Sequence, residues 1–204
     1  IPNPILGQLR KRQAMNSKTQ IIQGYLKKDM KCTLDKLCRY LGMSKKTIYR
    51  NFANKKDLEF ESLIYLCHKI NIGITEIQEN KLQVQEEFRE LSLFWFTTVI
   101  NSPTYDIFFS KEMMPRKNVT DLPNNSLIAI KDAFRENLRK GIQLKTYHAN
   151  FNYSVILNFY WSLINSLNRY TANEYGSTDN CEDINRLIRF HLNSISHKPY
   201  AKND

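Results

Sequence analysis

The stretch from Thr33 to Leu58, TLDKLCRYLGMSKKTIYRNFANKKDL, constrains the fold of this chain more than any other. Thr33 can cap a first short helix, and Gly42 can end it because glycine readily takes the left-handed backbone conformation found after helices. Ser44 can cap a second helix that runs to about Asn51. Two short helices joined by a tight turn containing glycine are typical of a helix-turn-helix unit.

The second of these helices is too short and too polar to be a core element. Its inward side is Ile48, with Phe52 at its end, and a third helix begins after Asn54, where Asp57 can return a hydrogen bond as in a capping box. The outward side of the second helix carries hydroxyl, phenol and cationic groups, which suit phosphates and base edges. These outward residues are Lys45, Lys46, Thr47, Tyr49 and Arg50.

This stretch resembles the DNA-binding signature of the TetR family of transcriptional regulators, which runs approximately T-x-x-x-I-A-x-x-A-G-V-S-x-x-T-L-Y-x-Y-F-x-x-K-x-x-L. The resemblance covers about 26 of the 204 residues and is specific because many positions agree at fixed spacing. The agreeing residues are Gly42, Ser44, Lys45, Thr47, Ile48, Tyr49, Phe52, Lys55 and Leu58.

The chain also departs from the family pattern. Cys38 and Leu41 stand where the family usually has Ala, so the packing of the first helix differs. Asn51 replaces an aromatic residue or His, and the segment 28–30, Lys-Asp-Met, replaces the Gly that usually precedes the unit. These differences bear on which operator sequence is read.

The net charge of +10 is confined to the N-terminal part of the chain. Residues 1–60 hold 14 Lys and Arg against 4 Asp and Glu, whereas residues 61–204 hold 16 of each kind. Charge alone is equally consistent with a solvated basic face, but together with the motif it favours a polyanion as partner. Arg10-Lys11-Arg12 is either a solvated helix start or part of an arm that contacts DNA.

Apolar residues recur at helical spacing along the rest of the chain, and only six Gly and six Pro interrupt it. The sequence therefore predicts an all-α protein. Gly141 is expected in a turn that extends to residue 150, and residues 116–125 form a polar loop. Besides the helix-turn-helix, helices are expected at 13–29, 55–80, 81–101, 102–115, 126–142, 151–172 and 179–196.

We expect two domains: an N-terminal arm with the helix-turn-helix DNA-binding domain at 1–54, and a helical bundle at 55–204 for effector binding and dimerisation. The helix expected at 151–172 is apolar around almost its whole circumference, so it must be covered on all sides. A second subunit would cover its outer face, although a fully buried helix in a monomer remains an alternative. The helix at 179–196 would complete a four-helix dimer interface, and its apolar stripe is Ile184, Leu187, Ile188, His191, Leu192 and Ile195.

The bundle contains more aromatic and Met side chains than a modest helical core requires. Such side chains suit an adaptable apolar cavity, although each alone is more simply explained as core. The TetR resemblance implies a ligand pocket in this bundle. The candidate ligand-binding residues are Trp95, Tyr105, Phe108, Phe109, Met113, Phe134, Phe151, Tyr160 and Trp161.

The sequence contains no motif of an enzyme, a metal site or a cofactor site. HExxH, GxSxG, a Walker loop and GxGxxG are all absent, and the four His are scattered without ligand spacing. The four Cys form no CxxC pair, which favours reduced thiols in the cytoplasm. No apolar run approaches the ~18 residues of a membrane span.

These observations predict a homodimeric transcriptional regulator, a repressor that a small apolar or weakly polar effector releases from a palindromic double-stranded DNA operator. By residue type and family position, the expected DNA-binding residues are Thr33, Ser44, Lys45, Lys46, Thr47, Tyr49, Arg50 and Lys55. The alternatives are a helical small-molecule-binding protein without DNA-binding function and, less favoured, an enzyme built on a helical bundle.

Overall fold

The computed structural model describes residues 17–27, 33–100, 121–150, 152–173 and 180–200, with side chains omitted at 168–173 and 180–181. All the regular secondary-structure elements in these ranges are helices, which confirms the predicted all-α class. The backbone pairing recorded outside the helices is an isolated antiparallel bridge between Tyr147 and Ser196. The expected helix at 102–115 lies outside the described residues.

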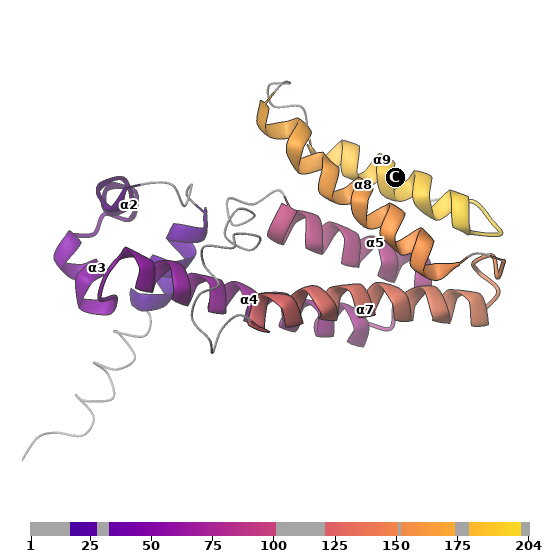
Figure 1. Cartoon of the computed structure of the whole chain (residues 1–204), viewed down its shortest axis with the longest axis horizontal. Helices are drawn as coiled ribbons and strands as arrows, with labels where there is room; N and C mark the ends of the chain where they lie inside the picture. Colours follow the sequence, from indigo (N-terminus) through magenta and orange to yellow (C-terminus); the bar gives the residue numbers. More distant parts are fainter. Residues whose placement is uncertain (1–16, 28–32, 101–120, 151, 174–179, 201–204) are drawn as a thin grey trace, which may run out of the picture.

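A small helical module occupies one end of the molecule (Figure 1). It consists of a helix at residues 17–27, α2 (Leu34–Leu41), α3 (Lys45–Asn51) and the start of α4 (Lys55–Glu79). The inward side chains of these four segments form a core of their own. Its buried members are Ile21, Ile22, Tyr25, Leu37, Ile48, Phe52 and Leu58.

The remaining helices form a bundle at the other end of the molecule (Figure 1). They are α5 (Val84–Trp95), a π-helical turn that extends it (Phe96–Ile100), α7 (Asp121–Gln143), α8 (Tyr153–Asn173) and α9 (Asn180–Ile195). α8 starts two residues later than expected because Asn152 caps it, its Oδ1 accepting the backbone N–H of Ser154 at 3.0 Å.

Helix α4 joins the two parts because its buried side chains belong to both cores. Leu58 completes the core of the module, whereas Leu63, Leu66 and Ile70 belong to the core of the bundle. Along its bundle half, α4 packs against α7 and α5. A displacement of α4 within the bundle must therefore move the module.

Helix α7 is longer at both ends than the sequence predicts. Residues 121–125 are helical rather than a loop, and Pro123 is tolerated because it is the third residue of the helix as described, where no helical N–H bond is lost. At the other end, Gly141 is helical and not part of the turn. The ring of Tyr147 lies where a β-carbon of residue 141 would be, so that position requires glycine for close packing.

The apolar stripe of α9 faces its own bundle, so our assignment of this stripe to a dimer interface is wrong. Ile184, Ile188, Leu192 and Ile195 are all buried within the single chain, in contact with the core that α5, α7 and α8 share. A core with this many helices offers enough apolar surface to cover them. Among the described side chains of α8 and α9, the large apolar ones that stay exposed are Val155, Phe159 and Phe190.

Candidate nucleic-acid interface and ligand site

The helix-turn-helix is built by the local signals that the sequence contains. Thr33 Oγ1 accepts the backbone N–H of Lys36 at 3.4 Å, and Ser44 Oγ accepts that of Thr47 at 3.1 Å, so both predicted N-caps form. Gly42 between the helices has φ 62° and ψ 27°, the left-handed conformation that glycine adopts at little cost.

The third N-cap also forms. Asn54 Oδ1 accepts the N–H of Asp57 at 2.9 Å, and Asp57 Oδ2 in turn accepts the N–H of Ala53 at 3.0 Å. These reciprocal bonds fix the start of α4 directly after α3, so the end of α3 cannot move independently of α4.

The core of the module anchors α3 through its middle residue and its C-terminal end. Ile48 and Phe52 are buried, and Asn51 donates its Nδ2 proton to the Thr47 carbonyl at 2.8 Å. The helix at 17–27 belongs to the same core. It is also joined to α4, because Tyr25 donates its hydroxyl proton to Glu59 at 3.0 Å. The backbone of α3 is thereby fixed while its outer face stays open.

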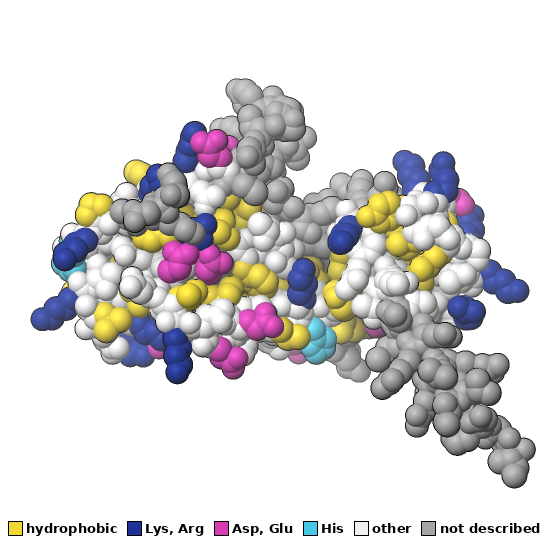
Figure 2. Space-filling view, turned by 180° about the vertical axis from the view of Figure 1, so that it is seen from behind, with side chains coloured by type: hydrophobic (Ala, Val, Ile, Leu, Met, Phe, Trp, Pro, Cys, Tyr) yellow, Lys and Arg dark blue, Asp and Glu magenta, His cyan; other side chains and the backbone are white. Residues whose placement is uncertain are grey.

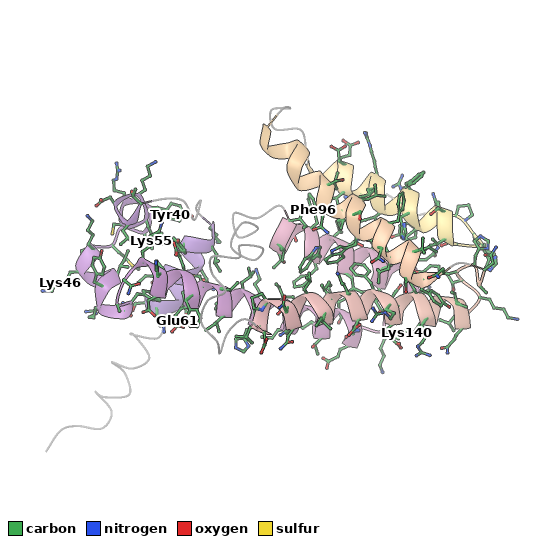
Figure 3. The ribbon with its side chains drawn as sticks, viewed as in Figure 1. Tyr40, Lys46, Lys55, Glu61, Phe96 and Lys140 are labelled. Atoms are coloured by element: carbon green, nitrogen blue, oxygen red, sulfur yellow. The ribbon has the colours of Figure 1, made fainter. Side chains whose placement is uncertain are left out.

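Lys46, Tyr49 and Arg50 are exposed on the outer face of α3, opposite the buried Ile48. Lys46 points away from the module at the end of the molecule farthest from the bundle (Figure 3). Lys and Arg side chains stand out from this same end in the space-filling view (Figure 2). The phenol of Tyr49, half exposed, adds a donor beside the cations.

The other predicted DNA-binding residues make contacts within the module. Lys45 Nζ lies 2.8 Å from Asp35 on α2, and Lys55 Nζ lies 3.6 Å from Glu59 on α4. Thr47, half buried, shares a hydrogen bond of 3.0 Å with Ser44 through their side-chain oxygens. Lys45 and Asp35 are both more than half exposed, so solvent screens this pair and a phosphate can compete for the lysine.

Two features of this surface were missed by the sequence analysis. The carboxylate of Asp35 lies beside Lys45 across the turn, a contact that no sequence spacing predicts. Lys36 and Arg39 are exposed on α2 and add positive charge next to α3. The signal for them was available, because neither fits the apolar stripe of that helix.

Three of the predicted ligand-binding residues, Trp95, Phe134 and Tyr160, are fully buried in the bundle, and Trp161 is half buried. The ring centroids of Trp95 and Trp161 are 5.1 Å apart, and those of Phe134 and Tyr160 are 5.8 Å apart. The structure therefore places these four residues in two aromatic pairs within the bundle. Tyr105, Phe108, Phe109, Met113 and Phe151 lie outside the described residues.

Polar groups are distributed among these rings. Tyr160 donates its hydroxyl proton to Ser92 Oγ at 2.6 Å, and Ser92 donates to the Phe88 carbonyl at 2.7 Å. Burial raises the pKa of Tyr160, so its hydroxyl stays protonated and remains a donor.

His191 on α9 joins this cluster, which the sequence analysis did not foresee as part of the ligand site. Its ring centroid lies 4.3 Å from that of Tyr160 and 5.3 Å from that of Phe88. Burial lowers the pKa of His191 from the usual 6.5 to about 4, so the ring is neutral at pH 7. Among the described residues, nothing hydrogen-bonds its buried Nε2 atom.

Other kinds of site are not found in the part of the chain that the structure describes. Its His, Cys, Asp and Glu side chains form no group of three or more placed to hold a metal ion. Cys38 and Cys67 are free thiols. No described helix combines the length and the apolar character needed to cross a bilayer.

Several solved structures that share this architecture are transcriptional regulators. No protein-family model and no curated protein matches the sequence. A TetR-family regulator from Agrobacterium tumefaciens aligns over 90% of this chain and 99% of its own, with a TM-score of 0.67 and 14% identity. The ketosteroid regulator KstR2 of Mycobacterium tuberculosis aligns over 91% and 96%, with a TM-score of 0.65 and 11% identity.

The transcriptional regulator FadR from Bacillus subtilis, in complex with stearoyl-CoA, aligns over 87% of this chain and 98% of its own, with a TM-score of 0.60 and 15% identity. At such identities the likeness concerns the path of the backbone, and it extends through both the module and the bundle. The chain therefore has the fold of TetR-family transcriptional regulators.

Proposed function

We propose that this protein is a ligand-responsive, sequence-specific DNA-binding transcriptional regulator that acts as a repressor in the cytoplasm. The observation that carries the proposal is the placement of α3 at the end of the molecule farthest from the bundle (Figure 1). Ile48 is its buried residue, and Lys46, Tyr49 and Arg50 are exposed. A capped, rigidly supported short helix with this outer face fits the major groove of DNA.

The residues of the interface divide into two roles. Lys45, Lys46, Thr47 and Arg50 enter the groove, where cations and hydroxyls can hydrogen-bond to base edges. Thr33, Ser44, Tyr49 and Lys55 flank the groove and hold phosphates, which fixes the register of α3 on the duplex. On binding DNA, Lys45 leaves its ion pair with Asp35. Both side chains are more than half exposed, so breaking this pair costs little free energy.

The protein acts as a homodimer through α8 and α9. Val155, Phe159 and Phe190 are 64%, 58% and 66% exposed, and an apolar surface of this kind on adjacent helices favours a second copy as cover. Two-fold symmetry then requires a palindromic operator, with the two copies of α3 about 34–36 Å apart in successive major grooves.

The effector is a small apolar or weakly polar molecule that binds among the aromatic side chains of the bundle. Trp95, Phe134, Tyr160 and Trp161 provide apolar contact, and the neutral imidazole of His191 provides one unused hydrogen-bonding atom. FadR, which shares this fold, has been solved in complex with stearoyl-CoA, and this supports an organic-ligand site in the bundle.

Signal transfer runs through α4. We divide the chain into a DNA-binding domain at 1–54 and an effector-binding and dimerisation domain at 55–204, and α4 begins at this boundary. Because Leu58 packs in the module and Ile70 in the bundle, a ligand that repacks the bundle changes the separation of the two modules. The effector needs only different affinities for the two arrangements.

The test is a selection of bound duplexes from a random pool, repeated with cell extract, followed by binding measurements on the selected and a random duplex. Lys46→Ala should weaken or alter sequence selection, whereas Tyr49→Ala should weaken binding to both duplexes alike. Lys69→Ala removes an exposed lysine from the bundle half of α4 and serves as the matched control. If neither variant loses affinity relative to the control, α3 is not the recognition helix.

The salt dependence of binding separates this proposal from its main alternative. A protein that neutralises phosphates loses affinity steeply as salt rises, because bound counterions are released from DNA on binding. A small-molecule-binding protein of the same fold without DNA-binding function would show no salt-dependent affinity for any selected duplex.

A further inference from the structure

Two histidines lie side by side at the end of the bundle away from the module. His148 belongs to the turn between α7 and α8, and His197 follows the end of α9. Their ring centroids are 4.1 Å apart, with 66° between the ring planes. His148 is half buried and His197 is exposed, and neither belongs to the proposed DNA interface or to the aromatic cluster.

The backbone holds these two residues together through reciprocal hydrogen bonds. The N–H of His148 donates to the Ile195 carbonyl at 2.8 Å, and the N–H of His197 donates to the Thr146 carbonyl at 3.0 Å. Between them, Tyr147 and Ser196 form the isolated antiparallel bridge. The positions from which the two imidazoles extend are therefore fixed before any ligand arrives.

Two hydrogen bonds hold this bridge to the bundle. Tyr147 donates its hydroxyl proton to the Val84 carbonyl at 3.0 Å, and Ser196 Oγ accepts from Gln85 Nε2 at 2.9 Å. Both segments are thus attached to the start of α5. A ligand that bridges the imidazoles would meet a prepared site, which reduces the entropy cost of binding.

The separation of the two rings determines how far they must move to hold one ion between them. With metal–nitrogen bonds of ~2.0–2.1 Å, two imidazoles at 90° place their ring centroids about 4.5 Å apart, and at the tetrahedral angle about 5.2 Å apart. The observed 4.1 Å is shorter than both values because the two rings meet edge to face. Binding therefore requires the exposed ring of His197 to move outward, and the right-angled arrangement needs the smaller movement. Imidazole nitrogens in a tetragonal arrangement are typical of Cu²⁺ and Ni²⁺.

We propose that His148 and His197 form a two-imidazole binding site for Cu²⁺ or Ni²⁺, with water completing the coordination. The bound ion clamps the α7–α8 turn to the segment after α9 and stabilises the native state by mass action. Lys145 and Lys198 are exposed and near in sequence, and their charge opposes the ion and limits its affinity.

The test is titration of the full chain with Cu²⁺ alone, followed by electron paramagnetic resonance and by thermal unfolding. The expected result is one strong site per chain, with hyperfine coupling to two nitrogens and a raised melting temperature. His148→Gln and His197→Gln should each weaken this site at least tenfold and leave one nitrogen coupled. His68→Gln, which removes an exposed histidine on α4, should change nothing.

Two outcomes would overturn the proposal. One is retention of the two-nitrogen signal and affinity in either the His148 or the His197 variant. The other is a natural chain that binds Cu²⁺ no more tightly than a variant carrying both His148→Gln and His197→Gln. The His197 side chain is exposed, so a folded variant is expected, and circular dichroism before the titration verifies it.

Discussion

The ring of Phe94 on α5 lies directly against Gly73 in the middle of α4, where a β-carbon would overlap it. This contact explains a glycine that otherwise weakens the helix joining the module to the bundle, by about 1 kcal/mol relative to Ala. The close approach of α4 and α5 at this point fixes how α4 sits in the bundle.

Gly73→Ala should therefore destabilise the protein by about 1–2 kcal/mol, because overpacking outweighs the gain in helix propensity. In a Phe94→Ala background the same change should stabilise it by about 1 kcal/mol, because only the propensity gain remains. Urea unfolding of the four proteins in this cycle measures the reversal. Equal effects of Gly73→Ala in the two backgrounds would show that Phe94 does not restrict this position.

The helix-turn-helix could be predicted almost residue by residue because its signals are local. Thr33, Ser44 and Asn54 cap helices through residues only three positions away, and Gly42 acts through its own backbone. Such interactions depend little on the rest of the fold. The residues that would read DNA follow from this placement, since one buried position, Ile48, defines the outer face of α3.

Features that depend on distant contacts could not be predicted. Asp35 meets Lys45 only after the turn has folded, and the His191 ring meets Phe88 only when α9 has packed on α5. Polar composition suggested a loop at 121–125, yet packing of Pro123 and Ser126 against the bundle keeps this segment helical. Periodicity located the apolar stripe of α9 but did not identify which surface would cover it.

Stability should fall on mild acidification because of His191. Its folded-state pKa of about 4 lies below the usual 6.5, so between these values the unfolded chain binds a proton that the native chain does not. Stability due to this group is therefore complete above pH 6.5 and is lost as the pH falls towards 4, by about 3 kcal/mol in total.

His191→Leu supplies the control for this prediction, since other groups also titrate in that range. Urea unfolding of both proteins between pH 7 and 4.5 should show a steeper loss for the natural chain than for the variant. Parallel pH profiles would mean that the imidazole is not buried in its neutral form.

Asp35→Asn should strengthen binding to every duplex, because it removes a carboxylate next to the proposed interface and releases Lys45 from its ion pair. We expect roughly a two- to fivefold gain at low salt on operator and random DNA alike, which shrinks as salt rises. Asp132→Asn is the matched control, because it breaks an exposed pair with Arg135 on the bundle. Fluorescence anisotropy at two salt concentrations measures both; an unchanged affinity for Asp35→Asn would place α2 away from the DNA.

Phe159→Lys should convert the proposed dimer to monomers without unfolding the chain. The side chain is 58% exposed, so a lysine there costs little in the single chain but would be buried and unpaired in the α8–α9 interface. Ile72→Lys makes the same kind of change at a position on α4 that is also 58% exposed, and it should leave the dimer intact.

Sedimentation velocity distinguishes the two variants, and duplex binding links the result to function. The monomeric variant should lose affinity for a palindromic operator far more than for a single half-site, because only a dimer engages both half-sites at once. A Phe159→Lys protein that sediments as the natural chain does would place the interface elsewhere. It would also leave Val155, Phe159 and Phe190 as an exposed apolar surface that needs another partner.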